Sequence, residues 1–257
     1  MRSLRWGWLP LGITFAFLYL PILVLVVMSF NASDSQFRWS GFSLDWYASL
    51  AGNMEIRAGL GNTLVVAIGT TIGSIILGTL LAIGLHRYVR WSVLDALSLG
   101  PAIAPDIVMA IGLLAFYVAI GVTLGLHTVL LAHIVFGTAF VAAIVKARLG
   151  HLDPALEEAS LDLGAPPLAT FFRVTVPNLA PAIVAGGLLV FTLSLDEFVI
   201  AFFTNGPATP TLPMVIYSML RFGLTPEINA LAALLLLVSF TAVIAAQRLT
   251  GLGGSDA

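Results

Sequence analysis

The chain of 257 residues lacks cysteine, has one lysine and carries few charges of either sign. The absence of cysteine excludes disulfides and thiolate chemistry. Charged residues make up 9% of the chain, whereas a soluble domain carries about 25%, so this chain cannot cover a water-facing surface. Its single lysine, Lys146, is followed by alanine, so the chain lacks the Gly-Lys-Ser/Thr of a P-loop and is not expected to hydrolyse ATP.

Other kinds of reactive site are also not expected. The four histidines show no metal-ligand spacing such as H-E-x-x-H. His127 and His133 are six residues apart and do not share a helical face, which favours packing over a proton relay. A net charge of −2 without a basic patch argues against nucleic acid as a partner. We therefore predict no catalytic residue, no metal and no cofactor in this chain.

Apolar residues make up 59% of the chain, and the mean hydropathy is +1.03. Runs of about 18 or more mostly apolar residues are typical of membrane-spanning helices, and six such runs occur. We predict an all-α membrane protein with a single transmembrane domain over residues 1–257. The predicted spans are about 8–30, 60–85, 97–119, 126–146, 180–203 and 227–247.

The lysine and arginine residues predict the orientation, because cytosolic loops carry an excess of them. With the N-terminus inside, only Arg38, Arg57 and Arg221 of the eleven are external. Both termini and the loop of residues 147–178 are therefore predicted to be cytosolic. The residues predicted to be inside are Arg2, Arg5, Arg87, Arg90, Lys146, Arg148, Arg173 and Arg248.

Three of the thirteen acidic residues fall inside predicted spans, namely Asp106, Asp196 and Glu197. A charged side chain at a span's centre costs about 3 kcal/mol or more, so such residues usually face a cavity or a partner. No lysine or arginine lies in a span to pair with them, so a cation is the natural ligand. Pairing with arginines of a partner subunit, or protonation within packed helices, stays open for these acids. Glu197 lies about 100° around the helix from Asp196, so both need not face one path.

Helical rise separates the acids along the membrane normal. Asp106 lies about 14 Å and Asp196 about 24 Å from the inner end of its span, so their levels differ by about 10 Å. A compact metal ion cannot touch both carboxylates, whereas an elongated polycation can. Pro101 and Pro105 interrupt the third span just before Asp106, and irregular backbone within a membrane is tolerated where it lines a water-filled cavity.

The predicted inner loop contains a charged, helix-forming stretch. Glu158-Ala159-Ser160 is followed after three residues by Gly164, and after nine more by Val174-Thr175-Val176-Pro177. This pattern resembles the EAA loop of bacterial ABC-importer permeases, E-A-A-x3-G-x9-I-x-L-P, whose short cytosolic helix docks into a groove on the ATPase. The chain departs from this pattern at Ser160, where the family has Ala, and at Val174 and Val176, where it has Ile and Leu. The Glu-to-Gly and Gly-to-Pro spacings are the same. The resemblance implies that Glu158, Ala159, Gly164 and Pro177 couple the chain to an ATPase.

The acid-bearing segments resemble spermidine/putrescine (PotC-like) permeases more specifically. Ala104 to Ile111 and Phe191 to Val199 are similar to that family's signatures, with Asp196-Glu197 where the family usually has Asp-Asp. The resemblance extends from about Tyr19 to Gln247 and implies a type I ABC-importer permease fold in the bacterial cytoplasmic (inner) membrane. The substrate-path residues that it implies are Trp46, Asp106, Asp196 and Glu197.

The resemblance also implies partners. These are a second permease subunit in a heterodimer, two ATPase subunits that hold ATP and Mg, an extracytoplasmic binding protein and a polyamine. We predict a permease subunit of an ATP-driven polyamine importer and not an enzyme. Two alternatives stay open. One is the same machine with another cargo, such as an opine, a phosphonate or ferric iron, although acids on the path disfavour anions. The other is a stand-alone cation-coupled transporter, which leaves the EAA spacing unexplained.

Overall fold

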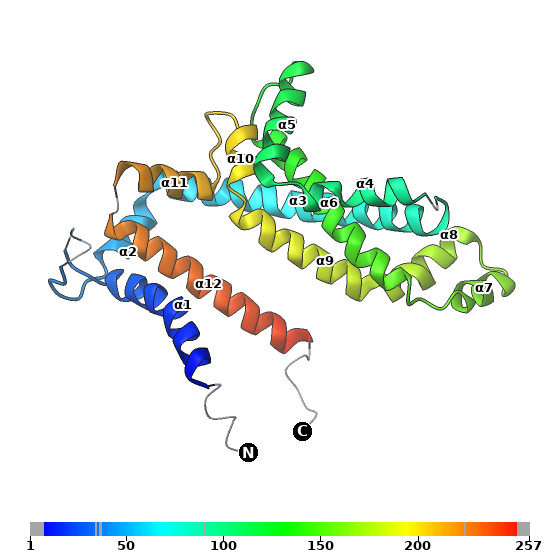
Figure 1. Cartoon of the computed structure of the whole chain (residues 1–257), viewed down its shortest axis with the longest axis horizontal. Coiled ribbons are helices and arrows are strands. Elements are labelled where there is room, and N and C mark those ends of the chain that lie inside the picture. The colour runs from blue at the N-terminus through cyan, green and yellow to red at the C-terminus, as the bar shows by residue number, and fades with distance from the viewer. Residues whose placement is uncertain (1–7, 34, 36–37, 90, 224, 251–257) are drawn as a thin grey trace. The chain divides into compact units, whose positions relative to one another are not determined.

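A computed structural model describes residues 8–33, 35, 38–89, 91–223 and 225–250, with residues 222, 239 and 242–250 described by their backbone alone. The elements assigned to these residues are helices, and one isolated β-bridge joins Asn31 to Phe42 (Figure 1). The chain divides into two compact units, which we describe separately. The terminal unit comprises Met1–Arg57 and Ile216–Ala257, and the central unit comprises Ala58–Val215. The predicted all-helical class is confirmed.

In the terminal unit, two helices, α1 and α2, both pack against α12. Glu227, in the first turn of α12, accepts hydrogen bonds from Ser49 Oγ at 3.2 Å and Asn53 Nδ2 at 3.4 Å, which ties α12 to α2. None of the residues of α1 is buried, as befits an apolar helix that faces lipid. The helices of this unit are α1 (Trp8–Met28), α2 (Asp45–Gly52) and α12 (Pro226–Thr250).

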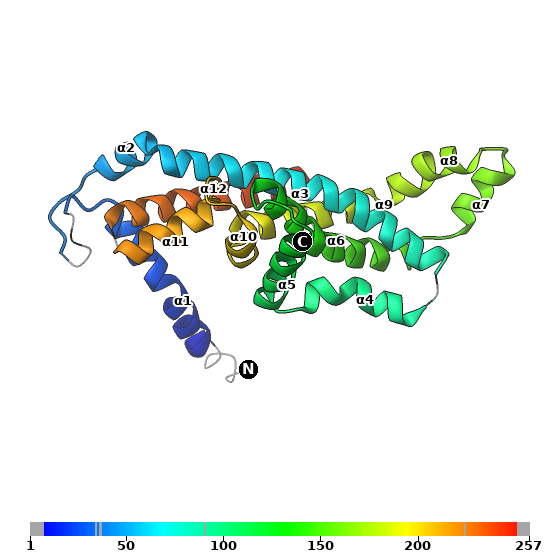
Figure 2. The ribbon, with the colours of Figure 1, turned by 90° about the horizontal axis from the view of Figure 1, so that it is seen from above.

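The central unit is organised around α6, which packs against α4, α5, α9 and α10. Figures 1 and 2 show α7 and α8 at one end of this unit, with α5 and α10 toward the other. The elements are α3 (Met54–Arg87), α4 (Ser92–Ile103), α5 (Asp106–Ala119), α6 (Leu126–Leu149), α7 (Ala155–Asp162), α8 (Pro167–Thr170), the π-helix η2 (Phe171–Thr175), α9 (Val176–Asp196), α10 (Val199–Thr204) and α11 (Leu212–Phe222), of which α3 and α11 each extend into the terminal unit.

Small residues let three helices of the central unit approach closely. A Cβ atom at Gly137 of α6 would lie 2.4 Å from Ser74 Oγ of α3 and 2.8 Å from Val190 Cγ1 of α9. About one turn earlier along α6, Ile134 Cδ1 would lie 2.7 Å from a Cβ at Gly73, the residue beside Ser74 on α3. Membrane helices pack through such small residues because lipid gives them no hydrophobic drive to associate.

Four helical runs of the described residues are long and apolar enough to cross a membrane, or five if α4 and α5 form one bent span. The predicted third span, residues 97–119, is therefore broken, because α4 and α5 meet at 102°. The described apolar part of α12 is shorter, Pro226–Val238. The protein thus has several apolar spanning helices, while the count of six spans and the cytosolic termini stay predictions. The four runs are Trp8–Met28, Met54–Arg87, Leu126–Leu149 and Pro167–Asp196.

Candidate functional site

The break between α4 and α5 positions Asp106. Proline disfavours a helical backbone at the residue before it, and Ala104 is accordingly extended, with φ −62° and ψ 139°. Helix α5 then begins at Asp106, where the free amides of a helix N-terminus favour an acid. Asp106 is exposed, and so are the apolar side chains of Ile103 and Ile107 beside it. The predicted interruption before Asp106 is confirmed at Pro105, whereas Pro101, which was also expected to interrupt the span, lies inside α4.

A second break, between α9 and α10, carries the other two acids. Asp196 is the last residue of α9 and is exposed. Glu197 has an extended backbone with ψ 109°, and its Oε1 accepts the N–H of Ile200 at 2.9 Å. This bond satisfies one of the free amides at the start of α10. The predicted fifth span, residues 180–203, is therefore two helices, and the acids lie at the interruption.

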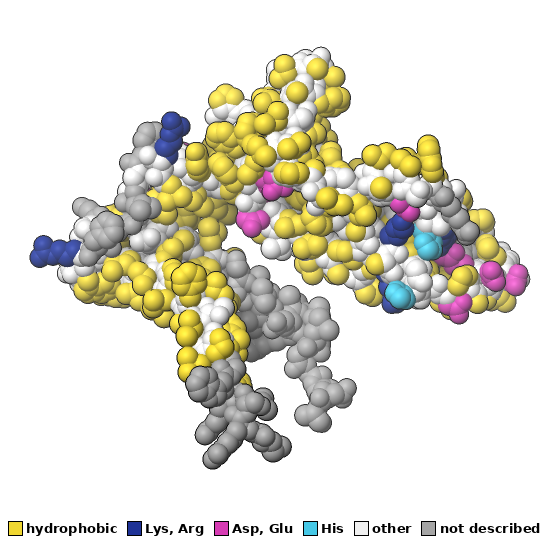
Figure 3. Space-filling model, viewed as in Figure 1, with side chains coloured by type: hydrophobic (Ala, Val, Ile, Leu, Met, Phe, Trp, Pro, Cys, Tyr) yellow, Lys and Arg dark blue, Asp and Glu magenta, His cyan; other side chains and the backbone are white. Residues whose placement is uncertain are grey.

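The two breaks lie close together. Helix α5 packs against α10, and Ala110 and Ile200 share one buried cluster. Asp106 begins α5 and Glu197 lies just before α10, so the packing of these two helices brings the acids into one region of the unit. Neither of the ion pairs found among the described residues includes these acids, and Figure 3 shows acidic side chains surrounded by hydrophobic surface in this region. We call Asp106, Asp196 and Glu197 the acid site.

Trp46, the fourth predicted path residue, lies on α2 in the terminal unit. Its indole N–H donates to the carbonyl of Asn31 at 2.8 Å. Asn31 is buried, and its side-chain amide donates to the carbonyls of Arg38 at 2.8 Å and Ser35 at 3.1 Å. Trp46 therefore has a structural partner within its own unit, and its place on a substrate path stays a prediction.

Residues 155–175 form a hairpin in which α7 packs against α8 and η2, and we call it the coupling hairpin. It turns at Gly164, whose φ of +84° lies in the left-handed region. The N–H of Gly164 donates to Leu161 O at 2.9 Å, and the N–H of Ala165 donates to Ser160 O at 3.1 Å. These are the two bonds of a Schellman motif, which explains the glycine at this spacing. Pro177 lies just after η2 within the continuous helical run Pro167–Asp196, where it cannot donate a helical hydrogen bond.

The two faces of α7 have different partners. Ser160 faces its own chain, and its hydroxyl shares a hydrogen bond with that of Thr170 at 2.9 Å. Glu158 and Ala159 are exposed, so the predicted coupling residues face away from the chain. The hairpin also exposes several large apolar side chains, as interaction surfaces commonly do. The exposed large apolar residues of the hairpin are Leu156, Leu161, Leu163, Leu168 and Phe172.

Glu157, next to the predicted coupling residues, makes two polar contacts that were not predicted from the sequence. Its Oε1 pairs with Arg87 at the end of α3 and accepts a hydrogen bond from Thr175 Oγ1 in η2. Glu157 and Ser160 are three residues apart and share a helical face, and this spacing was the one indication in the sequence.

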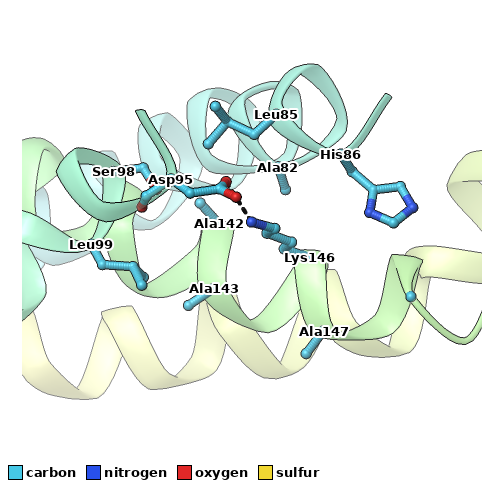
Figure 4. Close-up of a pocket in the computed structure, with 11 residues that line it drawn as sticks. Ala82, Leu85, His86, Asp95, Ser98, Leu99, Ala142, Ala143, Lys146 and Ala147 are labelled. Carbon is cyan, nitrogen blue, oxygen red and sulfur yellow. Dashed lines mark hydrogen bonds and ion pairs between the residues drawn. The ribbon is translucent and has the colours of Figure 1, made fainter. Parts of the chain in front are cut away.

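The single lysine lies in a cavity of about 450 Å³ that is lined by residues of α3, α4 and α6 (Figure 4). Lys146 pairs there with Asp95 of α4. Because this pair neutralises both side chains and much of the lining is alanine and leucine, the cavity offers little to select a charged cargo.

His133 is buried in the core of the central unit, as expected for a packing role. Its Nδ1 shares a hydrogen bond with Ser194 Oγ at 2.8 Å, which joins α6 to α9. The imidazole also packs against Phe136, with ring centroids 5.4 Å apart.

Comparison with known proteins gives consistent results. A family model described as the binding-protein-dependent transport system inner membrane component matches residues 74–251. The chain is 41% identical over 240 residues to the putrescine transport system permease protein PotI of Escherichia coli (strain K12), with 90% of this chain and 85% of that protein covered. It is 38% identical over 249 residues to the spermidine/putrescine transport system permease protein PotC of the same strain, with 96% and 93% covered.

Two solved structures are similar in fold. A chain of a bacterial ABC transporter involved in the import of the acidic polysaccharide alginate superposes with a TM-score of 0.75 at 16% identity, covering 96% of this chain and 98% of that one. A chain of the MetNI methionine ABC transporter in an inward-facing conformation gives a TM-score of 0.60 at 18% identity, covering 78% and 94%. At these identities the likeness shows the fold alone.

Proposed function

This chain belongs to the family of binding-protein-dependent transport system inner membrane components and is a permease subunit of an ABC importer, and we propose that its cargo is a polyamine such as putrescine or spermidine. The predicted family is confirmed by the match over residues 74–251 and by the relatives PotI and PotC. The chain is therefore a transport subunit and not an enzyme.

The acid site is the observation that carries the cargo assignment. Its three carboxylates lie at two helix breaks within an apolar surface, and no described lysine or arginine pairs with them. Interrupted helices are where membrane transporters commonly form their substrate sites. A polyamine carries several positive charges along one flexible chain, so it can neutralise more than one carboxylate. An anionic cargo would be repelled at the same place.

We infer that the acid site and Trp46 line this subunit's half of a path shared with a second permease subunit in a heterodimer. The exposed apolar side chains of α5, such as Val108 at 61% and Ile111 at 51%, support a membrane-embedded neighbour. An extracytoplasmic binding protein would deliver the cargo from outside. Six spans with both termini cytosolic, in a bacterial cytoplasmic (inner) membrane, fit this arrangement.

Two ATPase subunits complete the proposed assembly, one of them docked on the coupling hairpin. The outward face of α7 supports this role, because Glu158 and Ala159 are exposed beside apolar side chains. Gly164 contributes the turn of the hairpin, and Pro177 lies where the helical run leaves the hairpin toward Asp196.

The decisive experiment measures ATP-dependent uptake of labelled putrescine and spermidine into vesicles that contain the chain with its co-expressed partners. Asp196→Asn removes one charge from the acid site. A hydrogen bond to a charged group is worth about 1.5–3 kcal/mol net, so uptake should fall roughly 10- to 100-fold. Glu55→Gln is the matched control, because Glu55 is an exposed acid in the first turn of α3.

Three outcomes are informative. ATP-dependent polyamine uptake that falls with Asp196→Asn and not with Glu55→Gln supports both the cargo and the acid site. Uptake that Asp196→Asn leaves unchanged removes Asp196 from the path. A complex that hydrolyses ATP and takes up neither amine has a different cargo.

A further inference from the structure

The carboxylate of Glu157 is the meeting point of three elements of the central unit. Glu157 belongs to α7, and the same oxygen, Oε1, pairs with Arg87 and accepts a hydrogen bond from the Thr175 hydroxyl. Arg87 is the last residue of α3, and Thr175 is the last residue of η2, directly before α9. Helix α7 is thus joined through one side chain to the end of α3 and to the point where η2 continues into α9.

One of these helices leads directly to the acid site. Helix α9 begins at Val176 and runs without interruption for 21 residues to Asp196, a length of about 32 Å. The hairpin and the acid site accordingly lie toward opposite ends of the unit in both views (Figures 1 and 2). A displacement of α7 that is passed to the base of α9 can therefore reach the residues that face the cargo.

The local structure around Thr175 fits a point of transmission. Thr175 is 1% exposed and ends the π-helix η2, and such wide turns within α-helices occur often at functional sites. Glu157 and Arg87 are partly buried, with side-chain exposures of 20% and 28%. Ion pairs as open as this add little to stability, so folding alone does not account for three elements converging on one carboxylate.

Glu157 differs from its neighbour Glu158 in what it faces. Glu158 is exposed on the outward face of α7, whereas both polar contacts of Glu157 are made within its own chain. The other contact of the inward face, between Ser160 and Thr170, joins α7 to α8, at the start of the helical run Pro167–Asp196 that also contains Thr175. Glu157 therefore reaches α3 through Arg87 and also holds α7 against Thr175, at the base of α9.

We propose that Glu157 is a positioning residue that transmits displacement of the coupling hairpin to α3 and α9, and thereby couples ATP binding to opening of the acid site. This proposal rests on the proposed docking of an ATPase on the hairpin. Two adjacent residues then have different roles. Glu158 faces the ATPase, and Glu157 passes the displacement to the membrane helices.

The test uses the complex with its co-expressed partners and reads three quantities, namely ATPase co-purification, ATP hydrolysis and exposure of α9. Because the chain has no cysteine, Thr192→Cys introduces a single thiol on an exposed position one turn before Asp196. Its labelling rate with a water-soluble thiol reagent, with and without a non-hydrolysable ATP analogue, reports movement at this end of α9 without any cargo. Labelling is measured on this chain after the subunits are separated.

Glu157→Gln keeps the shape of the side chain and removes its charge. We expect the ATPase to co-purify normally and hydrolysis to stay within about twofold, while the nucleotide-dependent change in labelling falls about tenfold, within the usual range of coupling between sites. Arg87→Gln should have the same effect from the other side. The reversed pair, Arg87→Glu with Glu157→Arg, should restore most of the response.

The second ion pair of the central unit provides the control. Lys146 and Asp95 join α6 to α4 with side-chain exposures of 36% and 38%, and neither contacts the hairpin. Asp95→Asn should leave the labelling response unchanged. The proposal is overturned if Asp95→Asn reduces the nucleotide-dependent change in labelling as much as Glu157→Gln does, or if Glu157→Gln keeps the full change. It is also overturned if nucleotide does not alter the labelling rate when Glu157 is intact. Normal coupling without polyamine uptake would instead reject the proposed cargo and leave Glu157 in its role.

Discussion

Replacing Gly137 by alanine is expected to destabilise the central unit, although alanine is the better helix former. At an open helical position this exchange stabilises by about 1 kcal/mol. At Gly137 the added Cβ would lie 2.4 Å from Ser74 Oγ and 2.8 Å from Val190 Cγ1, so α3 and α9 must both move away. Overpacking of this kind costs about 1–3 kcal/mol, which leaves a net loss of up to about 2 kcal/mol.

Gly84 is the matched control, because a Cβ there meets no atom within 4 Å. The assay heats the purified complex in detergent and measures the fraction that stays monodisperse. A midpoint shift of about 2–4 °C per kcal/mol is expected for a chain of this size. Ser74→Ala should recover part of the loss, since Ser74 Oγ is the nearest atom and is among the buried atoms without a hydrogen-bond partner. If Gly137→Ala proved as stable as Gly84→Ala, the close packing of the three helices would be refuted.

Three further variants test the coupling hairpin and the acid site. Glu158→Lys should abolish ATPase co-purification and leave membrane insertion normal, and full uptake in this variant would contradict ATPase coupling through Glu158. Ser160→Ala removes one hydrogen bond to Thr170 and should lower thermal stability by about 1 kcal/mol while uptake persists, which heating and uptake assays check together. Glu197→Gln keeps an acceptor for the Ile200 N–H and removes the charge, so uptake should fall about tenfold if the charge faces the cargo and should not change if the residue only caps α10.

The interruption of the third span was predictable because its cause is local. Proline disfavours a helical backbone at the residue before it, so the sequence indicates a break near Pro101 or Pro105. The break lies at Pro105, whereas Pro101 stays inside α4. The break at Glu197 has no such cause, since neither proline nor glycine lies beside it. It depends on α10 packing against α5 and α6 and on Thr128 Oγ1 donating to Thr204 O at 2.6 Å. The axial separation of about 10 Å between the acids was likewise computed for two straight helices, and both spans are broken.

The coupling hairpin shows the same limit. Its turn was predictable from spacing, because Gly164 occupies the left-handed position that ends α7. Glu157 was not, because its partners come from 70 residues before it and 18 residues after it. Such contacts depend on how α3 and η2 lie beside α7, and no local pattern in the sequence contains that information. The sequence indicated only that Glu157 and Ser160, three residues apart, share one face of α7.

The three acids also differ in whether the end of their helix stabilises or destabilises a negative charge. This difference predicts which acid stabilises a bound cation most. Asp106 lies in the first turn of α5, at the positive end of that helix, and Glu197 accepts the N–H of Ile200 at the start of α10. Asp196 instead ends α9, where unpaired carbonyls already make the helix end negative. The carbonyls of this helix end and the carboxylate of Asp196 therefore act in the same direction. A bound amine is therefore stabilised most at Asp196, so neutralising this residue should weaken uptake more than neutralising either of the other two acids.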